Sequence, residues 1–266
     1  MGDQGVVTAA VVIIGNEILS GRTKDANLPY IAERLAGWGI QLMEARVVPD
    51  IEDEIVGAVN ALRAKFDYVL TSGGIGPTHD DITAASIAKA FDVPLDRHDE
   101  AVRRLQRHYE RPEDLTEARL RMANVPRGGV LIDNPVSAAP GFQVENVFVL
   151  AGVPRIMQAM IDGLQGRMAG GRQMQAVSIT CALPESILAP GLGEIQSDHP
   201  DVSIGSYPHF AAARSASRFG VSIVLRGLET TDVEAAADKV RDLMRSLGGT
   251  PEDRDLSNDK KAADHA

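Results

Sequence analysis

A nearly continuous run of apolar, largely β-branched residues at positions 6–14, VVTAAVVII, constrains the fold more than any other stretch of the chain. Such a run is typical of a strand buried on both faces, because a strand with one face in water alternates apolar and polar residues. A helical pattern with one apolar face follows at 28–38. Strand patterns then alternate with helical ones, the strands at 40–48, 66–72 and 144–150 and the helices at 51–66, 83–91, 98–122 and after 155. This alternation predicts an α/β domain whose mostly parallel sheet is covered by helices on both faces.

The rhythm changes after the glycine-rich, polar segment GRMAGGRQMQ at 166–175. The patterns that follow predict a βαββα order, which is a small α+β unit, with strands at 175–181, 201–207 and 218–226 and helices at 185–199 and 231–247. A chain of 266 residues with 44% hydrophobic content also exceeds what one core usually needs. We therefore expect a first domain at 1–168, a second at 175–248, and a charged, disordered tail at 249–266.

Charge and cysteine content limit the partners and the compartment. The formal net charge is −10 and no basic run is present, which argues against nucleic acid or an anionic membrane as the main partner. The single cysteine, Cys181, permits no intramolecular disulfide and fits a reducing compartment, so the cytoplasm is the expected location. The first apolar segment is too short to span a bilayer and lacks a basic flank, so no targeting or membrane segment is expected.

The strand at 66–72 runs into TSGGIGPTHDDIT, residues 71–83, which places three glycines and two adjacent carboxylates after one strand. In an open parallel sheet, ligands bind beyond the carboxyl ends of the strands. Glycines let backbone N–H groups approach an oxyanion, and a helix that begins near Thr83 adds its positive end, so the loop suits a phosphate or pyrophosphate. We expect a methyl group added at Gly74 or Gly76 to clash with the ligand rather than with the protein.

Acidic residues follow three of the predicted strands: Glu17 the first, Asp50 the second, and Asp80 with Asp81 the third. A divalent cation shared with phosphate oxygens would explain why acids stand beside an anion, and it would offset the repulsion between Asp80 and Asp81. Simpler interpretations stay open. The glycines can form a mere turn, Asp81 can be only a helix N-cap, and Glu17 and Asp50 can each be solvated loop acids. His79 in the same loop can contact ligand or solvent.

Other catalytic motifs fit the sequence badly. GNEILSGRT has one residue too many between its glycines for a P-loop, and Arg22 stands in place of the lysine. GGIGPTH lacks the third glycine of a dinucleotide fingerprint. The six histidines have no paired metal-ligand spacing, and no G-x-S-x-G elbow is present.

The segments SGGIGPTHDDIT, VVPD and IIGNEILSGRTKDAN resemble the molybdopterin-binding (MoaB/Mog-like) domain found in competence/damage-inducible CinA proteins and at the N-terminus of eukaryotic FAD synthases. The likeness is strong over about 1–168 and weaker over PESILAPGLGEIQSDHPDVSIGSYP. It implies a three-layer α/β/α domain whose glycine loop binds the phosphate of a pterin or nucleotide. The loop AGVPRIM departs from the family pattern at Ala151 and Ile156, which puts any role of an acid there in doubt.

The resemblance implies functional roles for Asp50 and Asp81, which match the family's aspartates, and for Glu17, which matches an acid of the CinA-like branch. We therefore expect Asp50 and Asp81 to be catalytic, and Mg²⁺, Mn²⁺ or Co²⁺ to be held by Glu17, Asp50, Asp80 and Asp81, with no organic cofactor. The residues expected to contact the ligand are Asn27, Ser72, Gly73, Gly74, Gly76 and Thr78.

Two functions remain open from the sequence. The first is a metal-dependent pyrophosphatase for a dinucleotide-like substrate such as ADP-ribose or FAD, and the second is a non-hydrolytic module that binds or transfers molybdopterin. A regulatory protein without catalysis is a third possibility. Neither the nicotinamide mononucleotide deamidase domain of many CinA proteins nor the adenylyltransferase domain of FAD synthases is recognisable, so neither activity is expected. The expected partners are a phosphorylated pterin or nucleotide and further copies of the chain, as a dimer or trimer.

Overall fold

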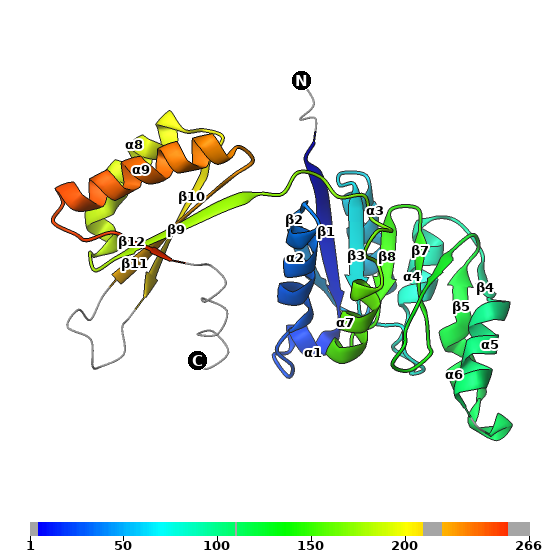
Figure 1. Ribbon diagram of the computed structural model, residues 1–266. Helices are drawn as coiled ribbons and strands as arrows, with labels where there is room; N and C mark the ends of the chain where they lie inside the picture. The colour runs from blue at the N-terminus through cyan, green and yellow to red at the C-terminus, as the bar shows by residue number, and fades with distance from the viewer. Residues whose placement is uncertain (1–4, 110, 210–219, 255–266) are drawn as a thin grey trace. The chain divides into compact units, whose positions relative to one another are not determined.

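The computed structural model describes residues 5–109, 111–209 and 220–254, and the chain divides into two compact units at residues 172 and 173. The first unit is built on a six-stranded sheet in the order β2-β1-β3-β8-β7-β6 (Figure 1). Its strands are β1 (Val7–Ile14), β2 (Ile40–Val48), β3 (Tyr68–Ser72), β8 (Val147–Leu150), β7 (Gly141–Val144) and β6 (Val130–Ile132). The first four are parallel, and β7 is antiparallel to both of its neighbours, β8 and β6. The mostly parallel α/β fold predicted from the sequence is confirmed.

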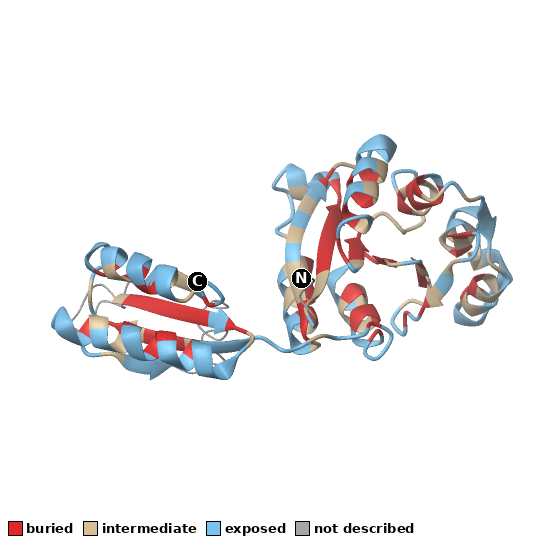
Figure 2. Ribbon diagram, turned by 90° about the horizontal axis from the view of Figure 1, so that it is seen from above, coloured by how far each residue is buried: buried red, intermediate tan, exposed pale blue. Residues whose placement is uncertain are grey.

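Strand β1 shows why the sheet is covered on both faces. Ala10, Val12 and Ile14 point into one hydrophobic core, and the alternate residues Ala9, Val11 and Ile13 point into the other. Helices α3 (Glu52–Arg63) and α4 (Thr83–Ala90) complete the first core, and α2 (Asn27–Gly37) and α7 (Pro154–Asp162) complete the second. The buried strands lie between half-buried helices (Figure 2), which is the expected three-layer arrangement.

The remaining elements of the first unit are short. They are the helices α1 (Asn16–Leu19), α5 (Asp99–His108) and α6 (Glu117–Leu120), the 3-10 turns Pro112–Asp114 and Arg121–Ala123, and the paired strands β4 (Leu95–Arg97) and β5 (Asn124–Pro126). The single helix predicted at 98–122 is therefore wrong. Helix α5 ends at His108, and Pro112 follows. Proline disfavours a helical conformation in the residue before it, so the chain restarts with new turns.

The strand predicted at 144–150 is also two strands. Strand β7 ends at Val144, the backbone turns at Glu145 with a φ of 48°, and β8 begins at Val147. The Asn146 side chain holds this turn by donating hydrogen bonds to the carbonyl oxygens of Arg63, at 3.0 Å, and Phe66, at 3.1 Å. The sequence pattern indicates one strand because the turn between the two strands is only two residues long.

The second unit has a four-stranded antiparallel sheet in the order β10-β11-β9-β12. Its elements are β9 (Gln175–Cys181), α8 (Glu185–Asp198), β10 (Ser203–His209), β11 (Gly220–Gly227), α9 (Thr230–Ser246) and β12 (Glu252–Arg254). Both helices pack on one core together with β9 and β11. The predicted βαββα order is confirmed, and the small α+β unit gains one further strand.

That further strand corrects part of the predicted tail. Residues Glu252–Arg254 pair with Ser178–Thr180 of β9, although their side chains are exposed. The Asp253 carboxylate also accepts a hydrogen bond from the Arg241 side chain at 3.0 Å. Backbone pairing and this ion pair order a segment whose composition alone predicts disorder, whereas 255–266 lie outside the described residues.

Candidate functional site

The glycine loop after β3 is folded back onto the first residue of α4. Gly73 and Gly74 have φ angles of 114° and 68°, which L side chains rarely adopt. The buried Thr83 closes the loop, because its hydroxyl donates to the Gly73 carbonyl at 2.9 Å and its N–H donates to the Gly74 carbonyl at 3.0 Å. The loop conformation is therefore fixed by the protein before any ligand binds.

The backbone N–H groups of Gly74, Ile75 and Gly76 donate no hydrogen bond to any residue that the structure describes. All three residues line a cleft, so these donors are open to a bound group. Consecutive free N–H groups at the start of a helix form a concave site that attracts anions. Binding of a phosphate at this loop stays a prediction.

A methyl group added at Gly74 or Gly76 would contact protein atoms. This changes the expectation that such a methyl group clashes with the ligand. A methyl group on Gly74 would lie 2.2 Å from the Thr83 Oγ1, and one on Gly76 would lie 2.7 Å from the Asp81 Oδ2. The added methyl therefore clashes first with the protein rather than with a ligand. A substitution at either position disturbs the loop itself.

Asp81 folds the end of the loop. Its Oδ2 accepts a hydrogen bond from the Thr78 N–H at 2.7 Å and a second, short one from the Thr78 hydroxyl. The helix N-cap is Ile82, without a side-chain cap, so Asp81 does not have the N-cap role considered as its simpler interpretation. Neighbouring Asp80 and His79 are exposed and lie 3.9 Å apart between Oδ1 and Nδ1. The pKa of Asp80 is lowered mainly by the Thr78 side chain, and further by the Asp80 N–H and by His79.

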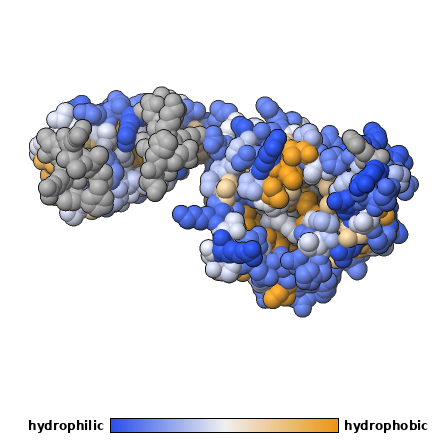
Figure 3. All heavy atoms as spheres, turned by 90° about the horizontal axis from the view of Figure 1, so that it is seen from below, coloured by the Kyte–Doolittle hydropathy of each residue, from blue (hydrophilic) through white to orange (hydrophobic). Residues whose placement is uncertain are grey.

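The cleft beside the loop has a volume of about 440 Å³ and lies at the carboxyl ends of the parallel strands. Seen from that side, the first unit is hollowed and hydrophobic side chains gather around the hollow (Figure 3). Of the predicted acids, Glu17 from α1 and Asp81 line it. The other lining residues are Thr23, Gly73, Gly74, Ile75, Gly76, Pro77, Met122, Asn134, Ser137, Ala139, Ala151, Gly152, Val153 and Ile156.

Asp50 and Asp80 do not line this cleft. The Asp50 Oδ2 accepts a hydrogen bond from the Asn16 N–H at 2.8 Å, so Asp50 supports the turn that carries Glu17. Among the described residues, no three side chains of histidine, cysteine, aspartate or glutamate are grouped closely enough to hold a metal ion. The four acids predicted as metal ligands are therefore not gathered into one centre in this structure.

Asn27 and Ser72 lie beneath the loop and tie three segments together. The Asn27 Nδ2 donates to the Ser72 Oγ at 2.8 Å and to the Gly152 carbonyl at 2.7 Å. The Ser72 Oγ donates in turn to the Ala151 carbonyl at 3.1 Å. Both side chains are buried. Their contacts position the glycine loop against the segment before α7, and a direct contact with ligand stays a prediction.

Two groups of residues at the site were not singled out from the sequence. The segment 134–139 contributes three lining residues, Asn134, Ser137 and Ala139, and the dipeptide Asn134–Pro135 is the turn signal that marks it. Arg121 brings a positive charge to the loop, because its Nη2 donates to the Pro77 carbonyl at 2.6 Å. Ile156, where the family tends to have an acid, contributes an apolar wall.

The structure has an α/β domain with a glycine loop beside a cleft at the carboxyl ends of its parallel strands, followed by a separate α+β unit. The family described as a probable molybdopterin-binding domain matches residues 10–168, and the chain belongs to this family. The FAD synthase middle domain matches residues 173–248. No helix among the described residues combines the length and apolar character needed to cross a membrane.

Individual relatives agree with this assignment. A protein of Pyrobaculum calidifontis is 36% identical over 211 residues, which are 76% of this chain and 80% of the relative. A protein of Aeropyrum pernix is 34% identical over 260 residues, which are 93% of this chain and 97% of the relative. The crystal structure of the protein CinA from Thermoplasma acidophilum, described as of unknown function, is 36% identical with a TM-score of 0.56 and covers 60% of this chain and 98% of that one.

Proposed function

We propose that the protein is a divalent-metal-dependent pyrophosphatase for a dinucleotide-like substrate such as ADP-ribose or FAD. The observation that carries this proposal is that Glu17 and Asp81 line the same cleft as the free N–H groups of Gly74, Ile75 and Gly76. The N–H groups suit a phosphate, and carboxylates beside a phosphate suit either a cation or proton transfer from water. The match of the second unit to the FAD synthase middle domain supports a nucleotide-related substrate.

The donor set fits a metal that binds together with the substrate. Mg²⁺ is usually held by one or two carboxylates plus substrate phosphates and water, rather than by a complete protein cage. Glu17 and Asp81 supply two carboxylates at the cleft, which agrees with the lack of a three-acid group among the described residues. When bound, the cation would neutralise phosphate oxygens and polarise phosphorus towards attack.

The residues of the chain then have separate tasks. The loop N–H groups hold the negative charge of the pyrophosphate, and Arg121 holds the loop through the Pro77 carbonyl. Glu17 or Asp81 takes a proton from the water that attacks one phosphorus, and the bridging P–O bond breaks to release two phosphate monoesters. Asp50 acts as a positioning residue through the turn that carries Glu17.

The test compares two adjacent aspartates. Asp81→Asn should reduce hydrolysis more than tenfold, which corresponds to about 1.4 kcal/mol of barrier, because the amide keeps the volume but not the charge. Asp80→Asn is the matched control, since Asp80 is exposed and does not line the cleft. Purified protein is assayed with ADP-ribose, FAD and NADH in Mg²⁺, Mn²⁺ and Co²⁺, and the melting temperature of each variant is measured. Equal rates for the two variants would argue against a central role for Asp81.

A second candidate is non-hydrolytic binding of a phosphorylated pterin such as molybdopterin. The apolar side chains of Ile75, Met122 and Ile156 give the cleft a surface for a flat ring. Binding of a phosphorylated pterin without turnover of any pyrophosphate would favour this candidate. The expectation of a dimer or trimer stays a prediction, which sedimentation analysis of the purified protein would test.

A further inference from the structure

A second cleft of about 500 Å³ lies next to the first and is lined by arginines. Arg104 and Arg107 come from α5, and the rest of the lining comes from the loop after β6 and from α7, namely Asp133, Asn134, Pro135, Ala138, Ala159 and Gly163. Neither arginine has a role in the function proposed above.

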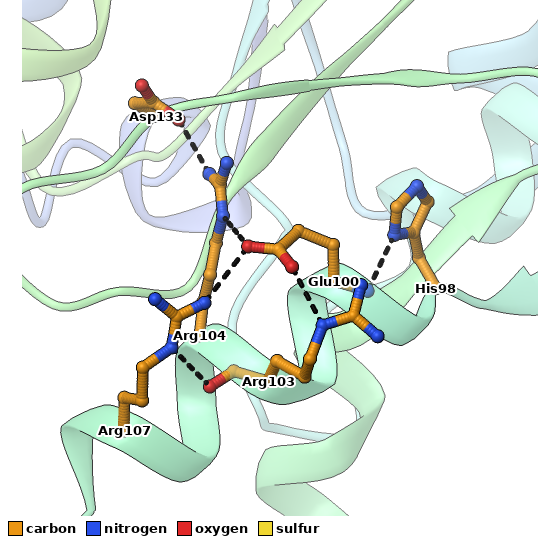
Figure 4. Close-up of polar contacts among 6 residues, drawn as sticks. All are labelled: His98, Glu100, Arg103, Arg104, Arg107 and Asp133. Atoms are coloured by element: carbon orange, nitrogen blue, oxygen red, sulfur yellow. Dashed lines mark hydrogen bonds and ion pairs between the residues drawn. The ribbon is translucent and has the colours of Figure 1, made fainter.

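The arginines carry more positive charge than their partners neutralise. Figure 4 shows the Glu100 carboxylate between Arg103, Arg104 and Arg107, and Arg104 also pairs with Asp133 at 2.6 Å. The nearest arginine contact, the hydrogen bond from Arg103, lowers the pKa of Glu100, so this carboxylate is ionised at neutral pH. The cluster as a whole has three guanidinium groups against two carboxylates, and two of these guanidinium groups, those of Arg104 and Arg107, line the cleft.

Both cleft-lining guanidinium groups keep donors for a ligand. Arg104 uses its Nε for Glu100 and its Nη1 for Asp133. Arg107 uses its Nε for the Arg103 carbonyl and its Nη2 for Glu100. The Nη2 of Arg104 and the Nη1 of Arg107 have no partner within the described ranges. Guanidinium groups with free N–H donors bind phosphate oxygens in preference to most other ligands.

The arginine cleft continues the glycine-loop cleft. Asn134 lines both. The N-cap residue Val153 and Ile156 of α7 line the first cleft, and Ala159 of α7 and the C-cap residue Gly163 line the second. These four residues follow one another at the spacing of a single helix face. Gly163 lies seven positions after Ile156, which is roughly 10 Å along a helix axis. One ligand can therefore lie along α7 with a group in each cleft.

The loop between the clefts has a defined shape. The Asn134 Oδ1 accepts hydrogen bonds from the Val136 and Ser137 N–H groups, at 3.0 and 3.1 Å. The Asn134 Nδ2 donates to the Ala139 carbonyl at 2.8 Å. Ala138 has a φ of 60°, which is uncommon for a residue with a side chain and implies that the surrounding contacts hold the turn. The spacing of the two clefts is thus set by the fold.

We propose that the Arg104–Arg107 cleft binds a second phosphate, remote from the pyrophosphate, of a nucleotide whose pyrophosphate lies at the glycine loop. This inference rests on the proposed site for the pyrophosphate. The ligand class it specifies is a dinucleotide-like compound whose ribose carries an additional phosphate, as in ADP-ribose 2′-phosphate. Such a compound places its extra negative charge one ribose away from the pyrophosphate, as the two neighbouring clefts require.

Calorimetric titration with ADP-ribose and with ADP-ribose 2′-phosphate tests the proposal, in Mg²⁺ and in parallel with a chelator. We expect the wild-type protein to bind the 2′-phosphorylated compound at least tenfold more tightly. Arg107→Gln should remove most of this preference, since the exposed Arg107 side chain can be shortened without unpairing a buried group. Arg103→Gln is the matched control, because Arg103 pairs with the same Glu100 but does not line the cleft.

The outcomes separate this inference from the proposed hydrolysis. A preference that is lost in Arg107→Gln and kept in Arg103→Gln supports the second phosphate site, even if neither compound is hydrolysed. Equal dissociation constants for the two compounds, or equal loss in both variants, would overturn the inference while leaving hydrolysis of ADP-ribose intact. Failure of both compounds to bind would overturn it together with the proposed pyrophosphate site.

Discussion

At the scale of single residues, the glycines of the loop serve the fold and the site at once. Gly73 approaches the Ile14 carbonyl so closely that an added methyl would lie 2.1 Å from its oxygen, and Gly74 leaves room for Thr83 in the same way. The close approach is what brings the ends of β1 and β3 and the start of α4 together. In this conformation the N–H groups of Gly74, Ile75 and Gly76 have no hydrogen-bond acceptor among the described residues.

The contribution of close packing at Gly74 can be separated from that of its backbone conformation. Gly74 and Gly21 have similar φ angles, 68° and 71°, but a methyl on Gly21 would meet nothing within 4 Å. Gly21→Ala should cost about 1 kcal/mol for the left-handed conformation alone. Gly74→Ala should cost an additional amount on the order of 1–3 kcal/mol for the clash with Thr83. Denaturant unfolding of both variants measures the difference, and equal losses would mean that Thr83 moves aside freely.

The sequence predicts individual site residues unevenly, and the reason is local. Glu17, Asp81 and the glycines follow directly from strand ends, so their convergence on the cleft could be anticipated. Asp50 also follows a strand, but its carboxylate is engaged by the Asn16 N–H, which is a contact between segments 34 residues apart. Asn134 follows β6, a three-residue strand that the sequence pattern does not predict, and Arg121 lies in a 3-10 turn, so only the folded chain brings them to the loop.

At the scale of elements, the parallel strands and their covering helices were predictable because hydrophobic periodicity reports burial directly. The hairpin of β7 and β8 was not, because a turn of only two residues, Glu145 and Asn146, lies inside a stretch that has the pattern of one strand. Strand β12 was missed for the opposite reason. Its side chains are exposed, and the backbone pairing with β9 that orders it leaves no trace in its composition.

One contact between elements predicts a pH dependence of stability. The Asp67 carboxylate before β3 accepts hydrogen bonds from the Thr8 N–H at 2.8 Å and the Thr8 hydroxyl at 2.7 Å, at the start of β1. The Thr8 N–H, and then the Thr8 hydroxyl, lower the pKa of Asp67. A lowered pKa in the folded state stabilises the fold above the unfolded value of about 3.9, and this stabilisation is lost as the pH falls through the folded pKa.

We therefore expect Asp67→Asn to be less stable than the wild type at neutral pH, with the gap narrowing below about pH 4. Thr8→Val should lose part of the stability that Asp67→Asn loses. It removes the Thr8 hydroxyl but keeps the Thr8 N–H, which lowers the pKa of Asp67 more than the hydroxyl does. Urea unfolding of the three proteins across the pH range gives the comparison. A gap that stays constant down to acidic pH would show that the charge of Asp67 contributes nothing.

At the scale of the whole molecule, each unit has its own hydrophobic core, and every lining residue of both clefts lies in the first unit. The glycine-rich composition of 166–175 predicts a weak connection, yet most of it belongs to the first unit. Met168 is buried, and the N–H groups of Gly171 and Arg172 donate to the carbonyls of Gly39 and Gly5. The boundary between the two units therefore falls after residue 172 rather than at residue 168.

This boundary predicts how fragments behave. A fragment of residues 1–172 should unfold cooperatively and bind a pyrophosphate compound with an affinity close to that of the full chain, because it contains the complete site. A fragment of residues 1–166 should be less stable, since it lacks the buried Met168 and the Arg167 side chain that donates to the Leu131 carbonyl at 3.0 Å. Thermal unfolding and calorimetric titration of both fragments beside the full chain provide the measurement. If 1–172 folds but fails to bind while the full chain binds, the second unit contributes to the ligand site, and the assignment of the whole site to the first unit is wrong.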